Sequence, residues 1–379
     1  MLPAPLSVYQ ERLALVQEDL RKRGLSGVLL FDPENLFWLT GYETIGYFTF
    51  HATYIAVDRA PVIIARVVNR DLALSYPTIA GFEAIVDTAD PVNLLTSYLA
   101  SAAAEQAVGI ETASRQLSVA DHTRLSEQAP CRLVDWNGVI ETRRPIKSDW
   151  EIERMRDAAR AAESGLRAAI DEVAPGKTEN DIAAAMLDGS IRAGSEYLGH
   201  PPLIVAGPTT ALCFAMWRRR TVAPGDVVLL EAAGCVGRLH AMLSRPVVVG
   251  KPTDEHVEAA DALQGVLEAA IEAIKPGLTA GEVDERCRRV VEQRGLGDFF
   301  RHRAAYGIGI GFPPNWSEGH IYAIRPGDPL VLQANMTFHV IPTLFKKTFG
   351  MCFSDSVRVT EDGCELLTNF PRRLFTVDA

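Results

Sequence analysis

The chain has 379 residues and a mass of 41.4 kDa, about twice the size of a typical domain, which predicts two domains. Hydrophobic residues make up 47% and charged residues 23%, with a mean hydropathy of +0.05, and this composition excludes a disordered or fibrous chain. The 48 acidic and 38 basic residues give a net charge of −10, which argues against a nucleic-acid or anionic-membrane partner. A small-molecule partner is the better expectation.

The six cysteines are scattered and form no C-x-x-C pair. This spacing excludes a zinc site built from cysteines and is typical of a reducing compartment. No apolar run reaches about 18 residues, and Glu11 comes too early for the core of a signal peptide. We therefore expect a cytoplasmic protein.

The first third of the chain alternates between helical and strand patterns. Apolar residues at helical spacing predict a helix over 8–24 that ends at Gly24, followed by a buried strand over 27–32. A further helix is expected around 91–104. Other β-rich runs occupy 54–58, 61–68, 83–88 and 107–112. Together these patterns predict an α/β domain.

A domain boundary is indicated near residue 142. Pro145 favours an extended residue before it, and Ser148 with Glu151 has the spacing of a capping box for a helix that starts around 149. We therefore predict an amino-terminal domain over 1–142 and a second domain over 143–379.

The second domain contains an internal duplication. Residues 168–181 and 269–282 align at an offset of 101, and each has a Pro-Gly turn followed by a Thr that can cap the next helix. Residues 222–234 and 324–336 share Pro-Gly-Asp before an apolar run and align at an offset of 102, which pairs Glu231 with Gln333. Two αα-β repeats predict pseudo-twofold symmetry around a shared central pocket.

Several motifs then point to a family. They are LTGY at 39–42, the PGxT turn at 175–178, LEAAGCVGRLHAMLSRPVVVG at 230–250, YGIGIGF at 306–312, NMTFHVIP at 335–342 and VTEDG at 359–363. In this order the motifs resemble the creatinase and Xaa-Pro dipeptidase family over nearly the whole chain. The resemblance implies a pita-bread catalytic domain behind a creatinase-like α/β domain, α/β (α+β) in class, and a homodimer.

The resemblance also locates the family's metal ligands. Peptidases of the family hold two metal ions with two Asp, one His and two Glu. The matching positions here are occupied by Glu231, Met242, Tyr306, Ile341 and Ser354. Because only one of the five keeps a carboxylate, we expect neither a metal nor another cofactor, and no metal-bound hydroxide.

Within the family, the segments 231–245, 306–316 and 332–342 look most like the metal-free ectoine hydrolase branch. That branch opens the tetrahydropyrimidine ring of ectoine and hydroxyectoine. Phe214 stands where creatinase-like members tend to carry a histidine. A relative with a different substrate therefore remains open.

Four residues are candidates for catalysis. Glu231 interrupts a buried strand, where an ionised carboxylate is costly unless it is paired, so it is either the partner of a cation such as Arg245 or a nucleophile or general base. His240 and His339 lie on strand-like runs that allow either to point into the pocket or to pack in the core. Tyr306 can donate a hydrogen bond through its phenol or serve as a core aromatic.

Other residues are candidates for substrate binding, with ordinary packing as the alternative for each. They are Trp217, Phe214, Phe312, Trp316, Asp355, Trp38 and Tyr47. Trp38 and Tyr47 enter by resemblance, as a segment that a neighbouring protomer lends to the pocket. The glycines over 306–311 do not fit a dinucleotide fingerprint, so no nucleotide cofactor is expected.

We therefore expect a metal-independent hydrolase that opens a small cyclic amidine, with Glu231 as nucleophile or base. Three alternatives remain at this point. The first is a creatinase-like hydrolase of a guanidino or ureido acid. The second is a catalytically silent binding module, and the third is a metal aminopeptidase.

Overall fold

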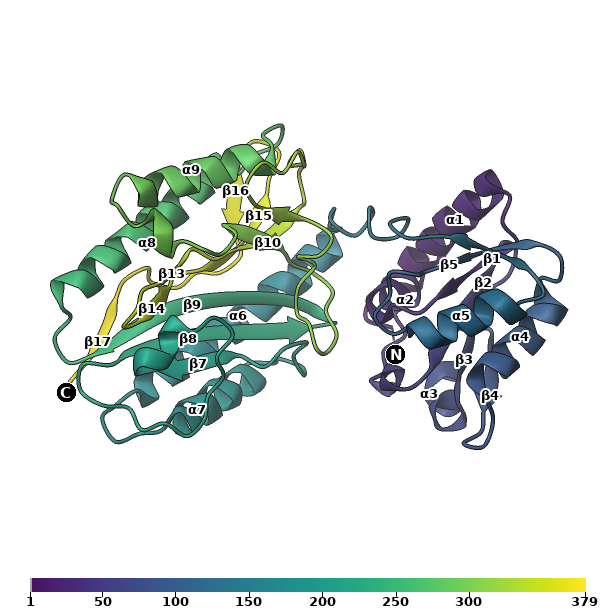
Figure 1. Ribbon diagram of the computed structural model, residues 1–379, viewed down its shortest axis with the longest axis horizontal. Helices are drawn as coiled ribbons and strands as arrows, with labels where there is room; N and C mark the ends of the chain where they lie inside the picture. The colour runs from purple at the N-terminus through teal and green to yellow at the C-terminus, as the bar shows by residue number, and fades with distance from the viewer. Residues whose placement is uncertain (1) are drawn as a thin grey trace. The chain divides into compact units, whose positions relative to one another are not determined.

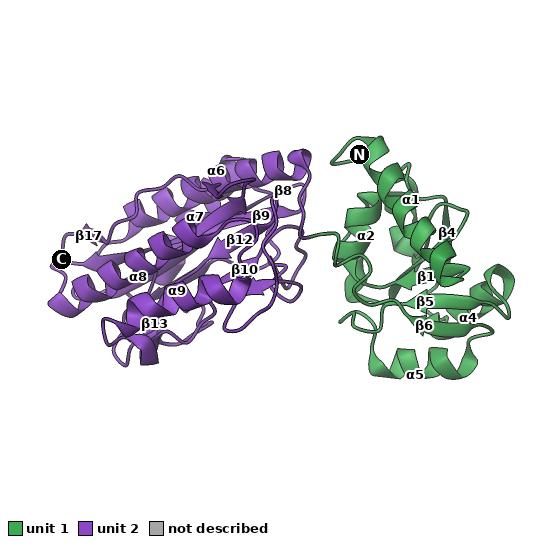
Figure 2. Ribbon diagram, turned by 90° about the horizontal axis from the view of Figure 1, so that it is seen from above, with its two compact units in different colours: residues 1–144 green, residues 145–379 purple. Residues whose placement is uncertain are grey.

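The computed structural model describes residues 2–379 and divides into two compact units (Figure 2). Unit 1 ends at Arg144 and unit 2 begins at Pro145. The boundary expected from the sequence lies two residues earlier, before Arg143. Arg144 belongs with unit 1 because its buried guanidinium donates a 2.8 Å hydrogen bond to the side chain of Asn35.

Unit 1 is a mixed sheet with helices on both faces (Figure 1). Its helices are α1 (Leu6–Arg23), α2 (Pro33–Thr40), α3 (Arg70–Leu74), α4 (Pro91–Ala102) and α5 (Val119–Gln128), with short 3-10 turns at Gly46–Phe48 and Val67–Asn69. Its strands are β1 (Gly27–Leu30), β2 (His51–Ala56), β3 (Val62–Arg66), β4 (Gly81–Ile85), β5 (Ala107–Ile110) and β6 (Arg132–Asp135), in the order β4-β3-β2-β1-β5-β6.

Strand alternation distributes the helices of unit 1. On β3, Ile64 packs with residues of α4 and α5, whereas Ile63 packs on the other face with residues of α2 and α3. The expected α/β alternation is confirmed. The first strand is shorter than expected because Asp32 caps α2, accepting hydrogen bonds from the backbone N–H groups of Glu34 and Asn35.

Unit 2 carries four long helices and two larger sheets. The helices are α6 (Asp149–Glu172), α7 (Glu179–Arg192), α8 (Asp254–Ala273) and α9 (Ala280–Glu292), with 3-10 turns at Gly207–Ala211 and Gly297–Phe299. The strands are β7 (Leu203–Ala206), β8 (Val227–Val236), β9 (Leu239–Val249), β10 (Ala305–Gly307), β11 (Ala323–Ile324), β12 (Thr337–Val340), β13 (Thr343–Phe345), β14 (Gly350–Cys352), β15 (Asp355–Val359), β16 (Cys364–Leu366) and β17 (Phe375–Val377). Within residues 2–379, no helix is long and apolar enough to span a bilayer.

Each of the two larger sheets of unit 2 is covered on its outer face by one pair of helices. The sheet β17-β9-β8-β7 packs its Val228, Leu230 and Ala232 against α6 and α7. The sheet β11-β10-β12-β15-β16 packs Phe338 and Val340 against α8 and α9. Alternation therefore leaves Leu229, Glu231 and His339 on the inner faces, between the two sheets.

The duplication is present, but its second half has a different offset. Thr178 forms a bridge with Thr221, and Thr279 forms the equivalent bridge with Val331, so the strand segments are related by 110 residues and not by 102. Backbone hydrogen bonds of the two copies agree with this offset, because Gly225 N–H donates to Val249 and Asn335 N–H donates to Val359. The pairing of Glu231 with Gln333 is therefore wrong, and Glu231 corresponds to Ile341.

The repeated Pro-Gly-Asp tripeptide explains the error. In the second copy it forms a turn before the strand, where the side chain of Asp328 binds Arg325 and the backbone N–H of Leu330. Gln333 follows this turn and is exposed. The residue that replaces Gly225 is Asn335, and both adopt the left-handed region, with φ of 88° and 69°.

The two copies meet at equivalent residues. Ser244 and Ser354 are related by the offset of 110, and they form an isolated antiparallel bridge with each other across the interface of the sheets. The pseudo-twofold axis therefore passes between these serines. Near this bridge, each residue of one copy lies across the axis from the equivalent residue of the other copy. Where the two copies differ in sequence, the two sides of the central region therefore differ in chemistry.

Asn335 offers a test of this equivalence. Both Asn335→Ala and Asn335→Gly remove the hydrogen bond that Arg358 donates to the Asn335 side chain. The loss of this bond is therefore the same in the two variants, and their difference in stability reports on the backbone alone. We expect the Ala variant to be less stable than the Gly variant by about 1 kcal/mol, because only glycine adopts positive φ without strain. Urea unfolding of both variants measures the difference, and equal stability would contradict the assignment.

Candidate active site

Glu231 lies at the centre of unit 2 on β8. Register pairs it with Leu203 on β7 and with Ser244 on β9. The side chain is buried, and this burial raises the pKa of the carboxyl to about 8, while a hydrogen bond with Tyr306 acts in the opposite direction. Without a ligand, Glu231 therefore holds its proton through most of the neutral range.

Tyr306 and His339 are register partners on β10 and β12, and their side chains meet beside Glu231. The Tyr306 hydroxyl lies 2.8 Å from Nδ1 of His339, and the same nitrogen lies 3.8 Å from Oε1 of Glu231. Burial lowers the pKa of His339 well below its ordinary value and raises the pKa of Tyr306 well above its own. A neutral histidine forms no ion pair with Glu231 at 3.8 Å, so the three groups are joined by hydrogen bonds.

Ser354 completes a hydrogen-bonded row of four residues. Its hydroxyl lies 2.6 Å from Nε2 of His339. All contacts are satisfied when Ser354 donates to Nε2, the Nδ1–H of His339 donates to Tyr306, and Tyr306 donates to ionised Glu231. We call these residues the Glu231 row. It connects the carboxylate to the serine on the pseudo-twofold axis.

Two cysteines also lie near the carboxylate. The pKa of the Cys352 thiol is raised to about 12 by burial and then by the charge of Glu231, and the pKa of Cys213 is raised by the same two causes in the same order. Cys213 is exposed, whereas Cys352 is buried. Cys213 therefore marks an exposed segment whose charge environment includes Glu231.

Phe214 follows Cys213 in that segment. Its side chain is 74% exposed and its φ is 61°, an uncommon value for a bulky residue. Trp316 reaches the row through a side-chain hydrogen bond with Tyr306, and its ring lies 4.8 Å from that of His200. Trp316 therefore contacts the row, and Phe214 directly follows Cys213 in the chain.

Two other predicted residues, Trp217 and Phe312, have described contacts with other groups. Trp217 lines a cavity of about 730 Å³ together with Tyr197, Pro313 and Pro314. Phe312 is buried, with the guanidinium of Arg238 4.9 Å from its ring centre. These contacts do not connect either aromatic side chain to Glu231.

His240 is placed by backbone groups and does not join the row. The N–H of Gly199 donates to its Nε2 at 3.0 Å, and its Nδ1 contacts the carbonyl of Arg238 at 3.1 Å. Burial lowers the pKa of His240 to about 3. With both nitrogens occupied, this neutral histidine anchors the loop before β7, and the geometry does not support a proton-transfer role.

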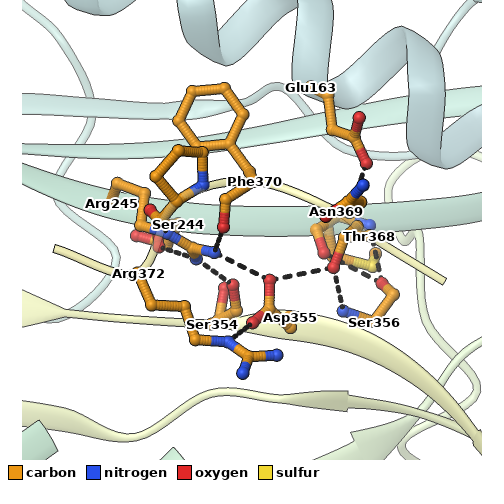
Figure 3. Close-up of polar contacts among 12 residues, drawn as sticks. Glu163, Ser244, Arg245, Ser354, Asp355, Ser356, Thr368, Asn369, Phe370 and Arg372 are labelled. Carbon is orange, nitrogen blue, oxygen red and sulfur yellow. Dashed lines mark hydrogen bonds and ion pairs between the residues drawn. The ribbon is translucent and has the colours of Figure 1, made fainter. Parts of the chain in front are cut away.

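Asp355 is also engaged elsewhere, in a buried network of polar contacts (Figure 3). Its carboxylate binds Arg245 at 2.9 Å and Arg372 at 2.6 Å, and accepts a hydrogen bond from Thr368. Arg245 donates as well to the carbonyl of Ser354. The buried partner of Arg245 is therefore Asp355 and not Glu231, and the pair fixes the backbone that carries Ser354.

Trp38 and Tyr47 belong to unit 1. Trp38 is buried on α2 under the guanidinium of Arg12, which lies 4.6 Å from the centre of its ring. Tyr47 is buried in the turn Gly46–Phe48. Their part in a pocket shared with a neighbouring protomer stays a prediction.

Comparison with known proteins places this site in a family. Residues 153–361 match the metallopeptidase family M24, and residues 12–146 match the creatinase/prolidase N-terminal domain. The chain belongs to metallopeptidase family M24. The resemblance and fold class expected from the sequence are confirmed.

Similar proteins include hydrolases named for different activities. The chain is 29% identical to an ectoine hydrolase of Halomonas elongata over 400 residues, which covers 99% of this chain and 98% of the relative. It is 30% identical to a probable dipeptidase PepE of Mycobacterium tuberculosis over 377 residues, with 98% and 97% covered. The prolidase structure from Thermococcus sibiricus shares the fold with a TM-score of 0.87 at 22% identity, over 97% of this chain and 99% of that one.

The family name implies metal ions, but the residues of this M24 protein do not fit them. Of the five positions that the resemblance assigns to ligands, Met242 and Ile341 present buried apolar side chains and Glu231 is the one carboxylate. Across residues 2–379, no three His, Cys, Asp or Glu side chains gather as a metal site would require. A dinuclear site needs several hard oxygen or nitrogen ligands, and the side chains at these positions do not supply them.

Two residues at the centre carry no functional signal in the sequence. Ser354 stands there only as a lost ligand position, and Cys352 reads only as a core thiol. Only the duplication could have pointed to Ser354, because the correct offset of 110 residues relates Ser354 to Ser244 and places both serines on the pseudo-twofold axis.

The Asp355 network predicts a large effect on stability. In Asp355→Asn, buried Arg245 loses its counter-charge, and we expect the free energy of unfolding to fall by about 3 kcal/mol. Glu285→Gln is the control, because its ion pair with Arg289 is solvent-exposed and contributes about 0–1 kcal/mol. Urea unfolding measures both variants, and a loss no larger than the control's would contradict a structural role for Asp355.

Proposed function

We propose that this protein is a metal-independent hydrolase that opens a small cyclic amidine, ectoine or 5-hydroxyectoine, to an N-acetylated diaminobutyrate. The observation that carries the proposal is the buried carboxylate of Glu231. Among residues 2–379 no Lys or Arg forms an ion pair with it, and its polar neighbours Tyr306 and His339 are neutral. A cationic ligand would supply the missing charge.

An amidinium suits this environment for two reasons. Its positive charge stabilises the carboxylate form of Glu231, because opposite charges attract strongly where water is excluded. Its central carbon is also the electrophile of the reaction. The substrate would therefore ionise the group that attacks it.

The reaction balances without a cofactor. A carboxylate oxygen of Glu231 forms a bond to the amidinium carbon, and the carbon–nitrogen bond to one ring nitrogen then breaks. Water attacks the resulting adduct and releases the carboxylate, leaving an amide on the other nitrogen. Both hydrogens of the water end on the released amine, which leaves as an ammonium group, while Tyr306 and His339 hold and transfer protons.

The relatives support this reading of the site. The similarity to the ectoine hydrolase of Halomonas elongata covers nearly all of both chains. Phe214 leaves open which cyclic amidine is preferred, because it stands where creatinase-like relatives tend to carry a histidine and its side chain is exposed. Ectoine and 5-hydroxyectoine are the first substrates to test.

We further propose a homodimer in which unit 1 of a neighbouring protomer contributes Trp38 and Tyr47 to the pocket. Large apolar side chains are exposed on unit 1, among them Ile45, Phe48 and Val68. Exposed apolar side chains of this size are typical of an interaction surface. Light scattering on the protein and on Phe48→Asp tests whether this surface holds two copies together.

The central test is turnover of ectoine by the purified protein, followed by NMR. We expect ring-opened product from the wild type and none from Glu231→Gln, which keeps the shape but cannot form a carboxylate nucleophile. Glu285→Gln, an exposed exchange of the same type, should retain activity. Activity should survive a strong chelator, and intact-mass analysis during turnover should show the adduct.

The substrate panel includes creatine and an Xaa-Pro dipeptide. Turnover of creatine alone would favour a creatinase-like enzyme, and chelator-sensitive cleavage of the dipeptide would favour a metallopeptidase. Binding of ectoine without turnover would indicate a silent module. Each of these results would overturn the proposed reaction.

The pKa of Glu231 predicts the pH dependence. Because the protonated acid cannot attack, and because burial raises the pKa to about 8, kcat/KM should rise with pH through a single limb centred near that value. The profile of kcat/KM between about pH 5.5 and 9.5 measures it. A profile already flat from about pH 5.5 upwards would show that Glu231 is ionised in the free enzyme, against the proposal.

A further inference from the structure

The two sides of the centre differ in chemistry. Strand β7 of the first copy corresponds to β10 of the second at an offset of 101 residues, which relates Val205 to Tyr306. The strand β8 corresponds to the segment that contains β12 at an offset of 110 residues, which relates Leu229 to His339 and Glu231 to Ile341. In each of these pairs, one member is polar and the other is apolar. The polar members make up the Glu231 row with Ser354, and the apolar members lie on the opposite side of the pseudo-twofold axis.

The apolar members pack together. Val205 and Leu229 are register partners on β7 and β8, and they form one cluster with Ile341 and Cys352. We call Val205, Leu229 and Ile341 the apolar wall. Tyr306 packs against this cluster, so the wall and the Glu231 row are contiguous.

The apolar wall keeps a small accessible surface on its inner face. On β8, Leu229 is 8% exposed and Glu231 4%, while Val228, Leu230 and Ala232 on the other face are fully buried. Ile341 is 7% exposed, whereas His339 and Val340 before it are fully buried. The small surface that remains accessible at the centre of unit 2 is therefore shared between the carboxylate and the wall.

We propose that the apolar wall receives an alkyl group on the reacting carbon, so that the substrate class is a C-alkyl amidine and not a guanidine or urea. This inference rests on the proposed function of Glu231. When one nitrogen-bearing side of the carbon faces the Glu231 row, the remaining substituent points towards Val205, Leu229 and Ile341. These side chains cannot accept a hydrogen bond, so an N–H placed there would be buried without a partner.

Binding to Glu231→Gln tests the inference apart from reactivity, because this variant cannot complete the reaction. Three ligands are compared by calorimetry: ectoine, whose reacting carbon carries a methyl group, the analogue with hydrogen there, and the cyclic guanidine with an amino group there. We expect ectoine to bind about 10-fold more tightly than the hydrogen analogue and about 100-fold more tightly than the amino analogue.

Val205→Thr provides a second measurement. Threonine has nearly the shape of valine but adds a hydroxyl, so the preference for methyl over amino should fall by about 10-fold in the Glu231→Gln background. Val257→Thr, on the exposed surface of α8, is the matched control and should leave the preference unchanged. The ligand series on Glu231→Gln alone already decides the inference if Val205→Thr does not fold.

The outcomes separate the two proposals. If the wild type opens ectoine but Glu231→Gln binds the amino analogue as tightly as ectoine, the alkyl inference is overturned and the function stands. If ectoine is neither opened nor bound, both are overturned. Preference for the methyl ligand that weakens in Val205→Thr and persists in Val257→Thr would support the inference.

Discussion

The buried, uncompensated carboxylate of Glu231 is the constraint on which the rest of the site depends. An ionised carboxylate in this position would cost several kcal/mol without a partner. The protein meets that cost by letting the group keep a proton, as its raised pKa shows. In the proposed reaction the same solution makes the site selective, because a positive charge is needed to bring Glu231 into its carboxylate form.

The pseudo-twofold duplication explains how such a group is placed. Two sheets, each covered by its own helices, present their inner faces to each other, and the Ser244–Ser354 bridge marks the axis. Symmetry alone would give the centre two identical sides. Substitutions on one side keep hydrogen-bonding groups at Tyr306, His339 and Glu231, and those on the other leave an apolar surface. In the proposed reaction this asymmetry would favour one orientation of the substrate.

Much of the fold could be predicted from local patterns, because caps, Pro-Gly turns and strand alternation act over a few residues. The capping box at Ser148 and the helix end at Gly24 are confirmed for this reason. The offset of the second repeat could not be predicted in the same way. Pro-Gly-Asp occurs in both copies, but only hydrogen bonding across the strands shows that Asn335 replaces Gly225.

The candidate site was predictable in type and less so in detail. Glu231 stood out because a carboxylate is rare within a buried strand. His240 and His339 could not be separated by alternation, since both lie on strands at the centre. The structure separates them by their partners: Gly199 and Arg238 occupy both nitrogens of His240, whereas side chains occupy those of His339. Such partners come from segments distant in sequence.

Two buried carboxylates near the axis show how charge is distributed in unit 2. Asp355 forms ion pairs with Arg245 and Arg372 and holds backbone in place (Figure 3). The polar neighbours of Glu231 in the described part of the chain are neutral. Had Arg245 faced Glu231, the carboxylate would be paired permanently, and a cationic substrate would have to displace a guanidinium to reach it. Because the buried arginine is paired with Asp355, it holds backbone in place and leaves Glu231 without a guanidinium partner, as the proposed reaction requires.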